Sequence, residues 1–95
     1  AGAKQAAFAV GKFGLRAVAQ SMARELAPKG IHVSHFIIEG MINNQRMRQL
    51  EPEKAAEEDG LVSTKALAEL YYQVHRQPKS SWTFEVDVRP WQASF

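Results

Sequence analysis

The chain has 95 residues, enough for one small domain, and a domain of this size buries only about 60–65% of its unfolded surface. With 45% hydrophobic and 23% charged residues, the composition excludes disordered, collagen-like and low-complexity classes. The net charge of +2 is small and the basic residues are scattered, which argues against nucleic-acid binding.

The absence of cysteine excludes a disulfide scaffold and a cysteine-ligated metal site, and it suits a reducing compartment. We therefore expect a cytoplasmic protein. No apolar run approaches the roughly 20 residues that span a bilayer, so we expect no membrane partner. The chain begins without methionine, in a segment that already has a helical pattern, and we expect it to be a piece of a longer protein.

Residues 5–27 are rich in strong helix formers and contain no proline, which predicts one long helix. Pro28 and Gly30 should end it, because proline cannot continue a helix and glycine suits the turn that follows. Arg16 and Gln20 fall largely off the apolar stripe of this helix. The stripe consists of residues at helical spacing, namely Leu15, Val18, Ala19, Met22 and Leu26.

Residues 31–38 are mostly β-branched and aromatic and are apolar on both faces toward their end, which predicts a buried strand of a parallel sheet. Residues 39–62 then break the regular pattern with glycine, proline and runs of like charge. Loops of this length within compact domains are usually functional lids or disordered. We interpret residues 41–62 as a mobile, partly helical excursion that resembles a substrate lid, and call it the lid segment.

Ser63 is a good N-cap for a second amphipathic helix that should end before Pro78. Its apolar face would carry Leu67, Leu70, Tyr71 and Val74. Residues 82–88 alternate between apolar and polar side chains, which predicts a strand at or near a sheet edge. The predicted order is therefore helix, strand, lid, helix and strand, with the two strands parallel and adjacent and the long helix packed on them.

Three kinds of site can be weighed on residue type and spacing. His32 and His35 are separated by an odd number of residues on a strand, so they point to opposite faces and predict no metal site. The acidic run at residues 51–59 lacks the glycine and spacing of a calcium loop and is typical of a solvated surface. Arg46 and Arg48 offer the only support for a nucleic-acid-binding domain, and we expect no nucleic-acid partner.

The long helix and the strand after it carry a family resemblance. Their sequence is FAVGKFGLRAVAQSMARELAPKGIHVSHFIIEGMI, and it is similar to the active-site region of short-chain dehydrogenases/reductases. In that family a Tyr-x-x-x-Lys pair precedes a helix of the type ALxxLxxSLAxELxxxGIxV, and a strand then ends in a Pro-Gly turn. Residues 15–33 match closely, and the later elements follow in family order. The resemblance implies an α/β fold, the C-terminal part of a Rossmann-like doubly wound parallel sheet, with residues 1–95 as a single partial domain.

The resemblance also implies site residues. Lys12 stands at the family's lysine, which binds the nicotinamide ribose and lowers the pKa of the catalytic tyrosine. Phe8 stands at the tyrosine position, where it has a ring but no hydroxyl to exchange a proton. Gly40, Ile42 and Asn44 align with the turn whose backbone touches the nicotinamide amide, although the strand ends in Glu39-Gly40 and not in Pro-Gly. On spacing alone, Lys12 is a solvated charge and Gly40 an ordinary loop glycine.

The family's glycine-rich turn and catalytic serine would lie before residue 1, so we expect the chain by itself to be catalytically incomplete and to bind no cofactor. The leading interpretation is a fragment of an NAD(P)-dependent oxidoreductase whose parent binds NAD or NADP and a small-molecule substrate. The alternative is a non-catalytic dinucleotide-binding or dimerisation module of the same fold. In either case the expected partner is the missing N-terminal half or a second copy of the chain.

Overall fold

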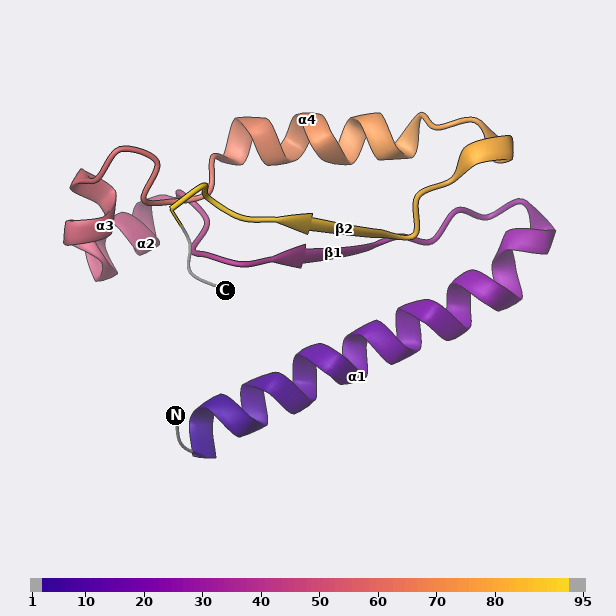
Figure 1. Cartoon of the computed structure of the whole chain (residues 1–95), viewed down its shortest axis with the longest axis horizontal. Coiled ribbons are helices and arrows are strands. Elements are labelled where there is room, and N and C mark those ends of the chain that lie inside the picture. Colours follow the sequence, from indigo (N-terminus) through magenta and orange to yellow (C-terminus); the bar gives the residue numbers. More distant parts are fainter. Residues whose placement is uncertain (1–2, 93–95) are drawn as a thin grey trace.

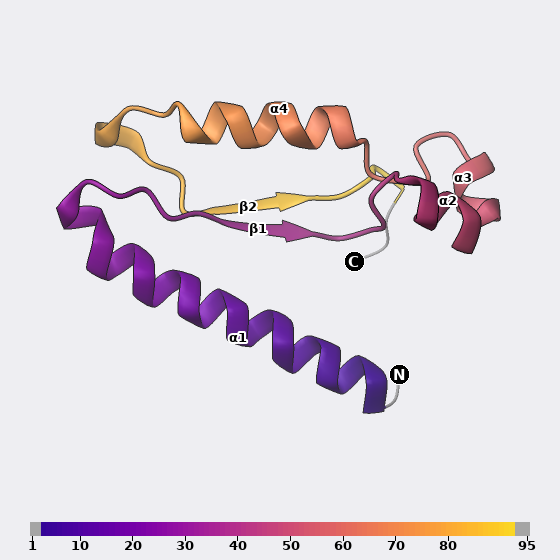
Figure 2. The same ribbon diagram turned by 180° about the vertical axis from the view of Figure 1, so that it is seen from behind.

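The computed structural model describes residues 3–92, which form a two-stranded parallel sheet with a helix on each face (Figure 1). Figure 2 shows the same layers from behind, with α1 diverging from the sheet toward its N-terminus. α2 and α3 lie beyond the ends to which the strands point. The elements are α1 (Ala3–Leu26), a 3₁₀ turn (Ala27–Lys29), β1 (His35–Ile38), α2 (Gln45–Leu50), α3 (Pro52–Ala56), α4 (Thr64–His75), a second 3₁₀ turn (Lys79–Ser81) and β2 (Glu85–Val88).

The long helix predicted for residues 5–27 is confirmed as α1, with the turn that follows it. Pro28 lies inside the 3₁₀ turn, where its fixed φ is tolerated. Gly30 closes the turn with a φ of 82°, and its N–H donates to the carbonyl of Ala27 at 2.9 Å. A glycine is favoured here because a left-handed conformation carries a steric penalty for residues with a β-carbon.

The side of α1 that faces the sheet carries polar side chains and small side chains. Arg16 and Gln20 are half-buried there, together with Ala19 and Ala23. Much of the apolar stripe is open to solvent instead, since Leu15, Val18 and Met22 are 58%, 56% and 43% exposed. Within the described chain, α1 therefore covers the sheet with one face and leaves a second, apolar face uncovered.

The parallel pairing of the two predicted strands is confirmed, with His35 opposite Glu85 and Ile38 opposite Val88. Both strands are shorter than the predicted ranges 31–38 and 82–88. The carbonyl of Thr83 accepts from Ser34 Oγ at 2.7 Å and lies 2.8 Å from His32 Nε2, so side chains take the place of strand pairing there. Regular pairing begins one residue later, where the N–H of His35 donates to Phe84.

The second helix is also confirmed. Ser63 Oγ accepts from the N–H of Ala66 at 3.2 Å, so α4 starts at the predicted cap. Leu67 and Val74 are buried on its inner face. Tyr71 meets Phe36 of β1 edge to face, with ring centroids 4.2 Å apart, and this contact joins α4 to the sheet.

The core is small for the size of the chain. Its buried hydrophobic residues within the described part are Val62, Leu67 and Val74. The chain exposes 7398 Å² of surface, whereas a folded protein of its mass exposes about 5,500 Å². Its radius of gyration is 15.6 Å, against about 12 Å for a compact domain of this length. The surplus surface is what a part of a larger domain would show.

Candidate functional site

A hollow of about 310 Å³ lies between α1 and the sheet. α1 runs antiparallel to the strands, so its first half lies near their carboxyl ends (Figure 1). Open α/β sheets bind their ligands at that edge. The polar and aromatic residues that line the hollow come from three elements, namely Phe8, Lys12, Phe13 and Arg16 from α1, His35, Phe36 and Glu39 from β1 and its end, and Glu85, Asp87 and Arg89 from β2 and its end.

Phe8 and Lys12 lie one turn apart on α1, as the four-residue spacing predicts. The Lys12 ammonium is 5.3 Å from the centroid of the Phe8 ring, within the range of a cation–π interaction. The ring is 68% exposed, so it is not packed as a core residue in this chain. The structure therefore brings together the two predicted catalytic positions and places both on the wall of the hollow.

An ion pair holds α1 to the sheet one turn after Lys12. Arg16 Nε donates to both oxygens of Glu85 at 3.2 and 3.1 Å, and Nη2 donates to Oε2 at 2.8 Å. These hydrogen bonds lower the pKa of Glu85, and the same bonds raise the pKa of Arg16. Sequence reasoning missed this contact, because its partners lie 69 positions apart and no motif links them.

Two further groups shape the carboxyl end of the hollow. Arg89 donates to Asp87 at 2.9 and 2.6 Å, which lowers the pKa of Asp87. The hydrogen bond from Arg89 raises the arginine pKa, and the negative charge of Glu39 adds to that effect. Glu39 follows β1 directly, its N–H donates to Val88 at 2.8 Å, and its side chain is exposed. A carboxylate thus shares this hollow with Phe8 and Lys12.

His35 is the buried polar residue of the described chain, with 9% of its surface exposed. It lies on β1 opposite Glu85 and lines the hollow. Its Nδ1 makes no hydrogen bond with the described residues. His32 lies three residues before the first residue of β1 and stacks on Trp82 with centroids 4.5 Å apart, so the two histidines have different surroundings.

The three predicted turn residues lie apart from this hollow and have different surroundings. Gly40 has a φ of 141°, and a β-carbon there would lie 3.1 Å from Pro90 Cδ, so the position requires glycine. Ile42 forms a parallel bridge with Val62, which closes the lid segment at its base. Asn44 Oδ1 accepts from the N–H of Met47 at 2.8 Å and caps α2, a role that capping signals could have predicted.

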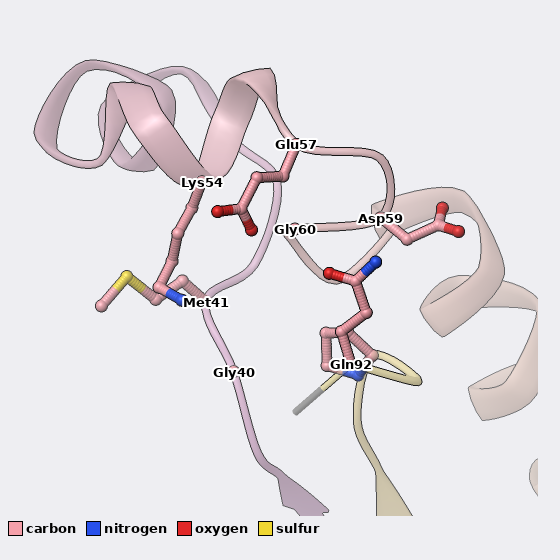
Figure 3. Close-up of a pocket in the computed structure, with 8 residues that line it drawn as sticks. Gly40, Met41, Lys54, Glu57, Asp59, Gly60 and Gln92 are labelled. Atoms are coloured by element: carbon pink, nitrogen blue, oxygen red, sulfur yellow. The ribbon is translucent and has the colours of Figure 1, made fainter. Parts of the chain in front are cut away.

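Gly40 instead borders a second hollow of about 190 Å³ (Figure 3). Lys54 and Glu57 of the lid segment face into this space from one side, and Gln92 closes it from the other. Trp91 Nε1 donates to Asp59 Oδ2 at 3.2 Å and joins the end of β2 to the lid segment. The structure therefore places Phe8 and Lys12 in one hollow and Gly40 in another, while Ile42 and Asn44 line neither of them.

Between residues 3 and 92, no cluster of three or more histidine, aspartate or glutamate side chains is arranged to hold a metal ion. None of the helices in that range is long and apolar enough to cross a membrane.

Comparisons with known proteins identify a solved structure that is similar to this chain. No protein-family profile matches the chain, and no curated protein does. A crystal structure of a short-chain dehydrogenase from Rhodopseudomonas palustris is similar to it, with a TM-score of 0.61 and 48% sequence identity. The match covers 90% of this chain and 30% of that chain. The predicted relationship to short-chain dehydrogenases is thus supported over nearly the whole chain, which spans less than a third of the length of its solved neighbour.

Proposed function

We propose that the chain is the C-terminal part of an NAD(P)-dependent oxidoreductase of the short-chain dehydrogenase/reductase kind, and that it is not catalytically complete alone. The observation that carries this proposal is the 48% identity to a short-chain dehydrogenase over 90% of the chain. The match to 30% of that neighbour leaves room for a preceding nucleotide-binding part. Below, "parent protein" means this chain joined to that part.

The proposed roles follow from the position of each residue. Lys12 would donate to the ribose of the dinucleotide, because its ammonium lies on the wall of a hollow at the carboxyl end of the sheet. Gly40 borders the second hollow, where its backbone would contact the nicotinamide amide. The bridge at Ile42 and the cap at Asn44 would hold that backbone in place. When bound, the nicotinamide supplies hydride transfer.

The most direct test of the proposal is to measure dinucleotide binding with and without the Lys12 side chain. Titration of the parent protein with NADH and NADPH, followed by nucleotide fluorescence, should give saturable binding of at least one of them. A hydrogen bond from a charged donor contributes about 1.5–3 kcal/mol, so Lys12→Ala should weaken binding about ten- to a hundredfold. Lys65→Ala, on an exposed position of α4, is the matched control and should leave the affinity unchanged.

A non-catalytic binding or dimerisation module of the same fold is the second candidate. It is favoured by Phe8, which places an apolar ring where the family has a proton-exchanging phenol. Cofactor affinity that does not respond to Lys12→Ala would favour this candidate over the oxidoreductase.

The uncovered surface predicts a partner for the chain. Leu15, Val18 and Met22 form an exposed apolar row along α1, at spacings of three and four residues. At about 25 cal/mol per Å² of apolar area, leaving such a row in water forfeits several kcal/mol from a small domain. We propose that the preceding part of the parent protein or a second copy of the chain covers it. Light scattering of the isolated chain at micromolar concentration should show self-association, and a stable, folded monomer would contradict this expectation.

A further inference from the structure

We propose that Glu39 is a catalytic base, the group that accepts the proton of an alcohol substrate at the site where Phe8 offers no hydroxyl. This inference rests on the proposed function and adds a catalytic residue to it. The reaction is the oxidation of secondary alcohols by an oxidised nicotinamide dinucleotide, and in the reverse direction the same group would return the proton.

The placement of Glu39 supports this role. Glu39 directly follows β1, and its backbone is fixed by the 2.8 Å hydrogen bond from its N–H to the carbonyl of Val88. Its exposed side chain lines the same hollow as Phe8 and Lys12. A ligand in that hollow would therefore be within reach of a carboxylate, an ammonium and an aromatic ring at the carboxyl edge of the sheet.

The other acidic groups and the histidine around the hollow are already hydrogen-bonded or buried. Glu85 accepts three hydrogen bonds from Arg16, and Asp87 accepts two from Arg89. His35 is buried, with 9% of its surface exposed. Among the described residues that line the hollow, Glu39 is thus the exposed carboxylate that takes part in neither of these two ion pairs and that can approach a ligand.

The charges around the hollow are compatible with this role. Lys12 lies on the same wall and Arg89 follows β2, so two cations line the hollow together with the Glu39 carboxylate. A carboxylate oxygen is one of the groups that general base catalysis uses.

Oxidation of the alcohol to a carbonyl compound moves one proton and one hydride. The O–H bond of the alcohol breaks, its proton moves to a carboxylate oxygen of Glu39, and the O–H electron pair forms the second bond of the carbonyl. The hydrogen on the adjacent carbon leaves as hydride to the oxidised nicotinamide dinucleotide, which is the two-electron acceptor. Glu39 then returns its proton to water.

The test uses the parent protein with NAD⁺ or NADP⁺ and three probe alcohols, namely 2-propanol, 2-butanol and cyclohexanol. Removing a general base typically costs about 10²–10⁴-fold, so Glu39→Gln should lower kcat/KM for oxidation by that factor. It should also abolish the decline in rate at acidic pH that protonation of a base produces. Glu58→Gln, an exposed lid position outside both hollows, is the matched control and should match the wild type.

A second readout does not depend on turnover. Glu39 should be coupled to glycine ethyl ester by a water-soluble carbodiimide, and peptide mass spectrometry can measure the extent. Cofactor and cyclohexanol together should protect Glu39 from this labelling, while Glu58 stays labelled. The double variant Phe8→Tyr with Glu39→Gln should recover part of the lost rate, because the added phenol takes over the proton.

The outcomes separate the two proposals. A parent protein that binds the dinucleotide but oxidises none of the probe alcohols, or whose Glu39→Gln variant keeps the wild-type rate and pH profile, contradicts the role of Glu39 alone. A parent protein that binds neither dinucleotide contradicts the proposed function, and the role of Glu39 falls with it.

Discussion

Replacing Phe8 by tyrosine is expected to raise carbonyl reduction by the parent protein by up to about 10²–10⁴-fold, the full contribution of a positioned general acid, because it adds a proton donor beside Lys12. The reason is geometric. The Lys12 ammonium lies 5.3 Å from the centre of the Phe8 ring, and a phenol so close to a cation ionises more readily. Because the ring is 68% exposed, the added hydroxyl needs no space in a packed core. Dinucleotide affinity should stay nearly unchanged, since Phe8→Tyr leaves Lys12 in place.

The measurement is the rate of cyclohexanone reduction with NADH and NADPH. Phe13→Tyr is the matched control, because it adds the same hydroxyl to the same helix but is followed four residues later by Ala17 and not by lysine. That control should gain nothing, and combining Phe8→Tyr with Lys12→Ala should remove the gain. Robust native reduction that Phe8→Tyr destroys, or equal effects of the two tyrosine variants, would contradict the assignment of Phe8 to the vacated tyrosine position.

Much of the fold could be predicted because its signals are local. Helix formers without proline predicted α1, and Gly30 marked its end through a left-handed φ. Ser63 marked the start of α4 through a side-chain hydrogen bond only three residues long. The parallel pairing of β1 and β2 was indicated by the apolar run at residues 31–38, which is typical of a strand buried in a parallel sheet, and by the order of the elements.

The remaining features depend on contacts between distant segments. The strands begin late because the side chain of Ser34 donates to the backbone carbonyl of Thr83 before regular pairing starts, and residue type alone does not reveal that. Arg16 looked like a surface residue because it lies off the apolar stripe, yet it holds α1 against β2 through Glu85. An ion pair across the sequence carries no periodicity, so only the folded arrangement shows it.

The candidate site was likewise predictable where it depends on local spacing and not where it depends on contacts between distant segments. The spacing of Phe8 and Lys12 placed them on one helix face, and the structure confirms that they lie together. Alignment to the family grouped Gly40 with Lys12, whereas the structure puts them in adjacent hollows. The reason is that Gly40 belongs to the base of the lid segment, where Pro90 and Val62 pack against its backbone. How a lid sits on a sheet depends on packing that spacing does not encode.

Replacing Leu67 by alanine is expected to lower the free energy of unfolding by about 2–5 kcal/mol, the usual cost of emptying a buried leucine site. Leu67 is 7% exposed, and it shares the small core with Val62 and Val74. A domain of this length has only about 5–14 kcal/mol to lose in total. Since α4 covers the face of the sheet opposite α1, the loss should loosen the support beneath the strands that carry His35 and Glu39 (Figure 1).

Leu50→Ala is the matched control, because it makes the same chemical change at a side chain that is 59% exposed. Surface substitutions of this kind usually change stability by less than about 0.5 kcal/mol. Urea unfolding followed by circular dichroism would measure both variants, at one protein concentration because self-association makes the midpoint depend on concentration. A large drop for Leu67→Ala with little change for Leu50→Ala is the expected result. Equal shifts would mean that α4 does not form the core, and that a partner on the exposed row of α1 contributes most of the stability.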